Sequence, residues 1–95
     1  MWLAKVKYED SDEIKQRPVL IIGENLGLFL SLKMTSHTAR NETDYLLKHW
    51  VQAGLKKATV VRTSKILALM ENDFERKLGR LMEYDLIRIQ NILLR

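Results

Sequence analysis

The 95-residue chain contains no cysteine and only one proline. Without cysteine it has no disulfide framework, no thiolate nucleophile and no cysteine-based zinc site. No apolar stretch approaches the roughly 20 residues that a membrane-spanning helix needs. The first residues, MWLAKVKYED, also lack the basic region and apolar run of a secretory signal peptide. We therefore expect a cytoplasmic protein with no membrane segment.

A chain this short forms one domain, residues 1–95, without internal repeats or linkers. Such a domain buries roughly 60–65% of the surface of its unfolded chain, so its hydrophobic core is thin. A second subunit would bury more apolar surface, and we expect a dimer on that ground.

Positive charge is concentrated in the second half of the chain. Residues 1–47 carry six Lys or Arg and seven Asp or Glu, whereas residues 48–95 carry ten and five. A basic half favours an anionic partner, such as nucleic acid or an acidic peptide. A solubilising surface is the alternative interpretation.

Short apolar and β-branched runs, separated by polar or glycine-containing segments, are typical of a mainly β protein. Strands are expected at 2–8, 17–23, 28–36, 45–50, 58–64 and 65–73. A C-terminal helix is expected over 82–95, where Leu86, Ile89 and Leu93 share one face and acidic residues stand near the start. The sequence thus predicts about five or six strands in a small barrel or half-barrel, followed by one helix.

The stretch QRPVLIIGENLGLFLSLKMTSH is expected to form a hairpin. A three-residue turn, Asn25-Leu26-Gly27, would place glycine at the position that prefers a left-handed backbone. Counting outward from that turn makes one face of the hairpin apolar, with the pairs Ile22–Leu30, Leu20–Leu32 and Pro18–Met34. The other face contains Gly23–Phe29, Ile21–Ser31, Val19–Lys33 and Arg17–Thr35. Cross-strand neighbours have Cβ atoms roughly 5 Å apart, so Arg17 and Thr35 are expected to meet at the polar end.

Four segments in this order resemble the PemK/MazF family of bacterial toxins: RPVLII, MTS, WVQAGLKKATVVR and KLGRL. The resemblance covers nearly the whole chain. It implies a compact SH3-like β-barrel with a C-terminal α-helix, as in the CcdB/PemK-like fold, and a homodimer. It also implies an mRNA-interferase-type endoribonuclease that cleaves single-stranded RNA selectively without metal or cofactor. An acidic, partly disordered cognate antitoxin would inhibit it.

The resemblance also implies site residues. The family's arginine before Pro-Val-Leu and its threonine or serine at the end of the next strand fall on Arg17 and Thr35, with Ser36 as the alternative. The hairpin register selects the same pair by a different route. His37 is the nearby side chain that titrates near neutrality, so it is the candidate general base or acid. His49, beside a tryptophan, is interpreted as structural.

Candidate RNA-binding residues are the cations and one aromatic ring near this site: Lys15, Phe29, Lys33, Lys56, Lys57 and Arg62. Lysine and arginine contact phosphates and carry affinity rather than sequence choice. Single-strand readers also stack bases on aromatic rings. Phe29 lies on the non-core face in the expected register, so it is the candidate for a base platform or a dimer contact.

The segment between the first two expected strands departs from the family pattern. Residues 9–16 contain four acids and no glycine, whereas relatives often have a longer, glycine-rich loop there. Two other functions stay open, and the acidic loop, which would repel phosphate, favours the second of them. One is a toxin of the same fold that poisons a protein target such as DNA gyrase. The other is a non-catalytic RNA-binding member of the family.

Overall fold

The computed structural model describes residues 1–7 and 12–95 of the chain. Within them, one antiparallel sheet contains β1 (Trp2–Lys7), β2 (Ile14–Asn25), β3 (Leu28–Thr35), β4 (Asp44–Leu46), β5 (Val60–Met70) and β6 (Phe74–Lys77). A short 3-10 helix, η1 (Glu71–Asp73), precedes β6, and the helix α1 (Glu83–Leu93) ends the chain. Residues 8–11, which include Tyr8 and two of the four acids of the segment after it, lie outside the described residues.

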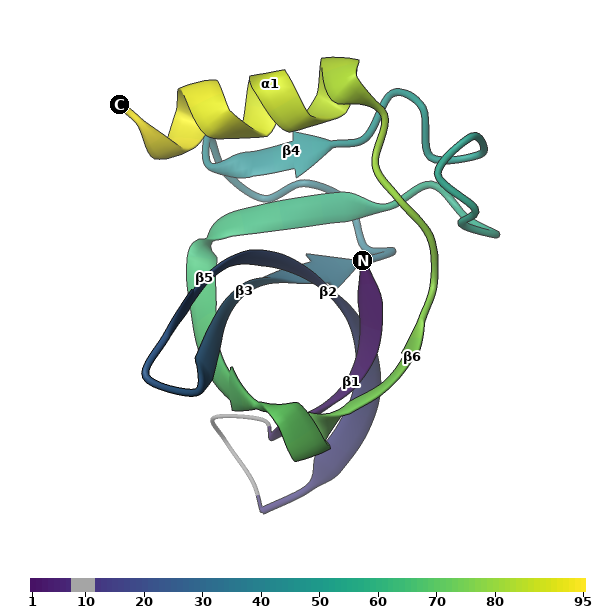
Figure 1. The fold of residues 1–95 in the computed structure, drawn as a ribbon. Helices are drawn as coiled ribbons and strands as arrows, with labels where there is room; N and C mark the ends of the chain where they lie inside the picture. The colour runs from purple at the N-terminus through teal and green to yellow at the C-terminus, as the bar shows by residue number, and fades with distance from the viewer. Residues whose placement is uncertain (8–11) are drawn as a thin grey trace.

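The sheet has the strand order β4-β5-β3-β2-β1-β6 and curls on itself beneath α1, as Figure 1 shows. The mainly β fold with a C-terminal helix is confirmed. The barrel is open, however, because β4 and β6 are the two edges of the sheet and do not pair with each other. In the part of the chain that is described, no helix is long and apolar enough to cross a bilayer.

The β2–β3 hairpin has the expected register at its polar end but not at its turn. Its turn consists of Leu26 and Gly27, both with positive φ (52° and 81°), as in two-residue type I′ turns. The prediction of a three-residue turn, Asn25-Leu26-Gly27, was therefore wrong. A bulge between Ile21 and Gly23 adds one unpaired residue to β2 and so offsets the shorter turn. Beyond the bulge the pairs are those predicted, from Ile21 with Ser31 to Val19 with Lys33.

Both faces of the hairpin contribute to a core, which the sequence did not predict. Leu20, Leu32 and Met34 pack beneath α1 with residues such as Ile89. On the concave side of the curled sheet, Val19 packs in a second cluster with Ala4, Val6 and Leu69. Because α1 covers only one end of the hairpin, Leu28 and Leu30 on the predicted core face remain 41% and 39% exposed.

The strand β5 is one continuous element where the sequence suggested two. It pairs Lys33 with Arg62 but Leu32 with Ile66, so residues 63–65 form an irregularity between them. Extra residues of this kind bend a strand and increase its twist. The bend lets one half of β5 lie under α1 and β4, while the other half continues along β3 in the curled part of the sheet (Figure 1).

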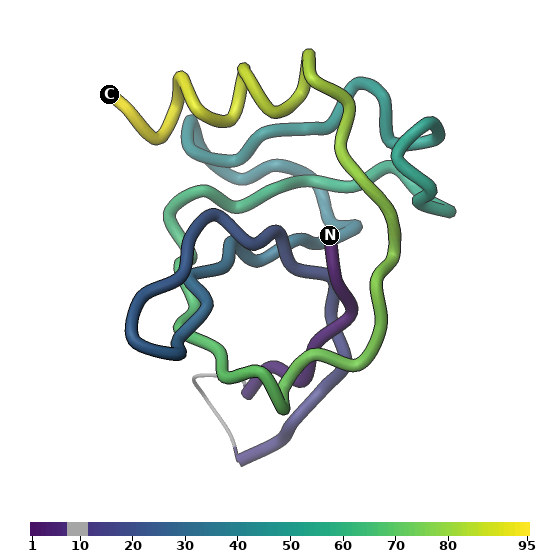
Figure 2. Tube along the Cα trace, viewed as in Figure 1, coloured from purple at the N-terminus to yellow at the C-terminus, as the bar shows by residue number. Residues whose placement is uncertain are grey.

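The chain passes from β6 to α1 alongside the N-terminus, as Figure 2 shows. The Met1 ammonium group donates a hydrogen bond to the Gly79 carbonyl at 3.0 Å. On its other side, Gly79 lies so close to Ala53 that a Cβ on Gly79 would overlap the Ala53 carbonyl oxygen. Two of the segments that carry the family resemblance, AGL and KLGRL, therefore contact each other here.

Asp85 anchors the first turn of α1 to β4 and to the segment after it. Its carboxylate is fully buried and accepts hydrogen bonds from the Tyr45 hydroxyl (2.6 Å) and from the backbone N–H groups of Lys48 (3.0 Å) and His49 (2.9 Å). The His49 ring packs against Tyr84. His49 therefore lies in this helix anchor, away from the predicted site.

Candidate functional site

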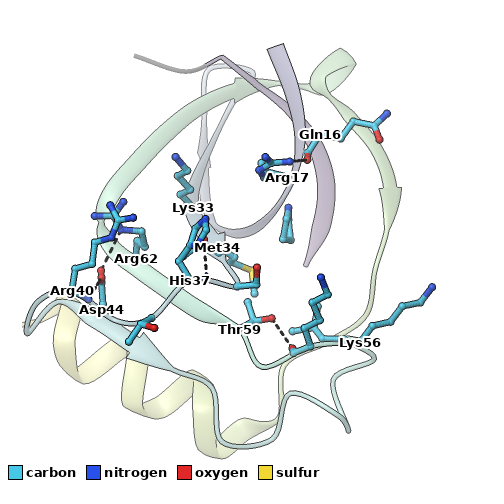
Figure 3. A pocket seen from close by; sticks show the side chains of 16 residues that line it. Gln16, Arg17, Lys33, Met34, His37, Arg40, Asp44, Lys56, Thr59 and Arg62 are labelled. Atoms are coloured by element: carbon cyan, nitrogen blue, oxygen red, sulfur yellow. Dashed lines mark hydrogen bonds and ion pairs between the residues drawn. The ribbon is translucent and has the colours of Figure 1, made fainter. Parts of the chain in front are cut away.

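A pocket of about 510 Å³ opens at the polar end of the β2–β3 hairpin. Its walls come from β2, β3, β4, β5 and the two loops that flank β4. The lining residues are Gln16, Arg17, Pro18, Lys33, Met34, Thr35, Ser36, His37, Thr38, Arg40, Asp44, Leu55, Lys56, Lys57, Thr59 and Arg62. Segments far apart in the sequence thus contribute to one cavity, which Figure 3 shows from close by.

The described lining is strongly basic. It contains six Lys or Arg side chains and His37, with Asp44 as its single acid. Figure 3 shows Arg40, Arg62 and Asp44 on one side of the pocket and Lys56 and Thr59 on the other. Positive charges held together in a concave site raise the local concentration of anions. The pocket is therefore suited to an anionic ligand with several charged groups.

Arg17 and Thr35 both line this pocket, from neighbouring strands. Arg17 pairs with Ala4 of β1, and Thr35 pairs with Val60 of β5. The last recorded pair between β2 and β3, Val19 with Lys33, lies two residues from each of them. Arg17 is half-buried and donates from Nη1 to the Gln16 carbonyl at 2.8 Å, which holds the guanidinium at the rim.

The Thr35 hydroxyl fixes the start of the loop that follows β3. Its Oγ1 accepts a hydrogen bond from the His37 backbone N–H at 3.2 Å. Local side-chain-to-backbone bonds of this type are how threonine stabilises a turn. Because this bond uses Oγ1 as an acceptor, the hydroxyl hydrogen is left to be donated elsewhere. Ser36 and His37 are exposed and line the same pocket.

Three charged residues stand in one row across the sheet. Lys33 on β3 pairs with Arg62 on β5, and Arg62 pairs with Asp44 on β4. Paired residues project on the same side of a sheet. The Arg62 Nε atom lies 3.5 Å from Asp44 Oδ1, and the Asp44 side chain is only 1% exposed.

Most of the residues predicted from the sequence meet in this pocket, and two do not. Arg17, Thr35, Ser36, His37, Lys33, Lys56, Lys57 and Arg62 line it. Lys15 lies one residue beyond the lining of β2. Phe29 lies towards the turn, half-buried, with its ring edge-on to Phe74 at 5.3 Å between centroids. It thus packs on Phe74, which borders the concave core, and is not part of the pocket wall.

Sequence reasoning missed Asp44 and Arg40. Asp44 lies in the polar segment that was expected to be a loop, and nothing in its neighbours marks it. Its partner Arg62 is 18 residues away in sequence, so only the pairing of β4 with β5 brings them together. Arg40 contributes its backbone N–H to the other carboxylate oxygen of Asp44, at 2.9 Å.

Comparisons with known proteins find a family and two similar structures. A family profile described as "PemK-like, MazF-like toxin of type II toxin-antitoxin system" matches residues 1–95. The Mycobacterium tuberculosis toxin MazF-mt6 superposes with a TM-score of 0.74 at 17% identity, over 98% of this chain and 92% of that one. A structure described as "Crystal structure of Mtb toxin" gives a TM-score of 0.70 at 20% identity, over 81% and 88%. At these identities the structures show a shared fold, and a search of curated protein sequences finds no match.

Proposed function

The chain belongs to the family of PemK-like, MazF-like toxins of type II toxin–antitoxin systems, and on this premise we propose that it is an endoribonuclease that cleaves single-stranded RNA. The observation that carries the proposal is the basic pocket in which Arg17 and Thr35 stand on neighbouring strands. RNA presents closely spaced phosphates and exposed 2′-hydroxyl groups, which this combination of cations and hydroxyls fits.

The proposed reaction needs no protein nucleophile and no metal ion. The 2′-oxygen of one nucleotide attacks its own 3′-phosphorus and gives up its proton to a base. The P–O bond to the next nucleotide breaks, and that 5′-oxygen takes a proton from an acid. The products are a 2′,3′-cyclic phosphate and a 5′-hydroxyl. The site must therefore supply a base, an acid and positive charge for the phosphorane-like transition state.

In this proposal Arg17 supplies the positive charge, because its planar guanidinium pairs with two phosphate oxygens and stays protonated. Thr35 donates its hydroxyl hydrogen to a phosphate oxygen, since its Oγ1 already accepts the His37 N–H. Preorganised donors of this kind stabilise charge that develops in the transition state. The His37 imidazole, exposed at the pocket, serves as the base or the acid. Ser36 is the alternative hydroxyl to Thr35.

The remaining cations bind the RNA backbone. Lys33 and Arg62 would contact phosphates on one side of the cleaved bond and Lys56 on the other, because Figure 3 shows them in opposite parts of the pocket. Lys57, which also lines the pocket, would add a further phosphate contact. Such contacts give affinity that falls steeply with salt but little choice of sequence. Messenger RNA as the substrate would make the cytoplasm the place of action.

The antitoxin is proposed to be an acidic, partly disordered peptide that competes with RNA for the basic pocket. A disordered segment can cover a large surface as it folds on binding. A homodimer is proposed as well. Its support is the apolar outer face of β3 and β5, where Leu28 pairs with Met70 and Leu30 with Ala68 while all four stay exposed. Exposed apolar patches mark association sites in soluble proteins.

Incubation of the purified protein with a long single-stranded RNA in EDTA tests the proposed activity. Discrete fragments that end in 2′,3′-cyclic phosphate are the expected result. Intact RNA would contradict it, and two further assays would then separate the alternatives. Inhibition of DNA gyrase supercoiling would indicate a protein-directed toxin, whereas salt-sensitive RNA binding without products would indicate a non-catalytic family member.

A further inference from the structure

We propose that Asp44 is a positioning residue, which holds the Arg62 guanidinium at the pocket wall so that it can bind a phosphate of the RNA. The inference rests on the proposed function, because RNA supplies the phosphate. Its evidence is separate, since it concerns a carboxylate that the reaction described above does not use.

Both oxygens of the Asp44 carboxylate face groups of the protein. Oδ1 lies 3.5 Å from Arg62 Nε, and Oδ2 accepts the backbone N–H of Arg40 at 2.9 Å. The Asp44 side chain is 1% exposed and that of Arg62 is 16% exposed. An acid that reached into a phosphate-binding pocket would repel the ligand. Asp44 does not do so, because it is buried and both of its oxygens face donors of the protein. It can therefore hold the Arg62 guanidinium in place.

The surrounding backbone makes this arrangement rigid. Thr63, next to Arg62, donates from its backbone N–H (3.1 Å) and from its hydroxyl (2.6 Å) to the Thr43 carbonyl, next to Asp44. The Asp44 N–H in turn donates to the Asn41 carbonyl at 3.1 Å. The loop before β4 is therefore tied to β5 next to the Asp44–Arg62 pair, and a hydrogen bond within the loop holds the Asp44 backbone.

The Asp44–Arg62 pair involves Nε of the guanidinium, so the two terminal nitrogens can face a ligand. Arginine has donors on Nε and on its two terminal nitrogens. With Nε directed at Asp44, the terminal nitrogens are the donors that can bind two oxygens of one phosphate. Lys33 stands beside Arg62 in the same row of the sheet, so a phosphate held there would meet a second cation.

The test measures RNA binding as well as cleavage, with the variants Asp44→Asn and Arg62→Ala and the double variant. A labelled 2′-O-methyl RNA of mixed sequence serves as the probe for binding, because it cannot be cleaved by attack of its 2′-oxygen. Glu42→Gln is the matched control, since Glu42 is an exposed acid of the same loop. Thermal unfolding of each variant establishes that it is folded.

Asp44→Asn is expected to weaken kcat/KM for RNA cleavage by about 10- to 100-fold, the range that small misplacements in a site produce. Most of the loss should appear in KM. The slope of log affinity against log salt concentration should fall by about the value for one phosphate contact, and Arg62→Ala should show the same fall. The double variant should be no worse than Arg62→Ala, because Asp44 acts only through Arg62. Glu42→Gln should match the wild type.

Wild-type affinity and salt dependence in Asp44→Asn would overturn the inference, as would losses that multiply in the double variant. If Asp44→Asn does not fold, Arg62→Lys replaces it. That variant keeps the charge but has no Nε–H, so it should bind nearly as weakly as Arg62→Ala, and wild-type binding by it would refute the positioning role. A protein that binds the probe through Arg62 and Asp44 but leaves RNA intact would refute the proposed cleavage alone. A wild-type protein that neither binds nor cleaves would refute both.

Discussion

The Tyr45 hydroxyl donates a 2.6 Å hydrogen bond to the buried Asp85 carboxylate, and so joins β4 to the first turn of α1. The same short strand begins with Asp44, whose carboxylate holds Arg62 in the pocket. One three-residue strand thus carries both the anchor of the helix and a wall of the proposed RNA site. We expect the stability of the helix anchor to determine how firmly that wall is held.

Asp85→Ala should lower the free energy of unfolding by about 3–5 kcal/mol. The substitution leaves one hydroxyl and two backbone N–H groups without their buried acceptor, and each such group costs about 1–3 kcal/mol when it is not satisfied. Denaturant unfolding followed by tryptophan fluorescence measures the loss. Glu83→Ala is the control, because Glu83 is an exposed acid in the same helical turn and its loss should cost less than about 1 kcal/mol. Equal losses in the two variants would contradict the anchor.

Stability should depend on pH through the same carboxylate. Burial raises the pKa of Asp85, but the hydrogen bonds from Tyr45, Lys48 and His49 and the nearby His49 ring outweigh it, so the pKa lies below its ordinary value of 3.8. The ionised form is thus favoured in the folded state. Its contribution is full above the unfolded pKa and is lost as the pH falls through the folded pKa.

The difference in unfolding free energy between the wild type and Asp85→Asn should therefore be constant near neutral pH and shrink below about pH 4. Denaturant titrations of both proteins from neutral to acidic pH measure this difference. A difference that stayed constant to about pH 2 would show that the pKa of Asp85 is the same in the folded and the unfolded protein, and would contradict the stabilised carboxylate.

Gly79→Ala should destabilise the protein by about 1–3 kcal/mol, the range for overpacking a close contact. The added Cβ would overlap the Ala53 carbonyl oxygen, which belongs to the backbone and cannot rotate away. Gly23→Ala is the matched control, because an added Cβ there would meet no atom within 4 Å. Thermal unfolding compares the two. If Gly79→Ala lost as little stability as Gly23→Ala, the segments around Ala53 and Gly79 could move apart without cost, which would contradict the close contact.

Strand alternation was sufficient to place Arg17 and Thr35 at the same end of the hairpin, where both line the pocket. Arg17 and Thr35 lie at the same end of neighbouring strands because the alternation of β2 and β3 can be read from Val19, Leu20 and their partners. The turn was predicted one residue too long. The ladder matches the prediction from Ile21–Ser31 to Val19–Lys33 because the bulge near Ile22 compensates for the shorter turn. Gly23, a residue type that often marks a bulge inside a strand, was the signal that the prediction did not use.

Residues that depend on the curl of the sheet were not predictable in this way. Phe29 was expected on the non-core face of the hairpin, yet its ring meets Phe74 because the sheet brings β6 round to the concave side. Asp44 and Asp85 look like ordinary surface acids in the sequence. Their roles come from partners that lie 18 and up to 40 residues away, and only the folded chain brings these together.

The central claim is that Arg17 stabilises the transition state of RNA cleavage. The measurement is the initial rate of cleavage of one long RNA in EDTA by the wild type, Arg17→Ala and Arg76→Ala, an exposed arginine on β6 that serves as the control. We expect Arg17→Ala to be at least about 100-fold slower, the usual effect of removing one preorganised transition-state donor. Arg76→Ala should cleave at the wild-type rate. Cleavage by Arg17→Ala at the rate of the control would contradict the account.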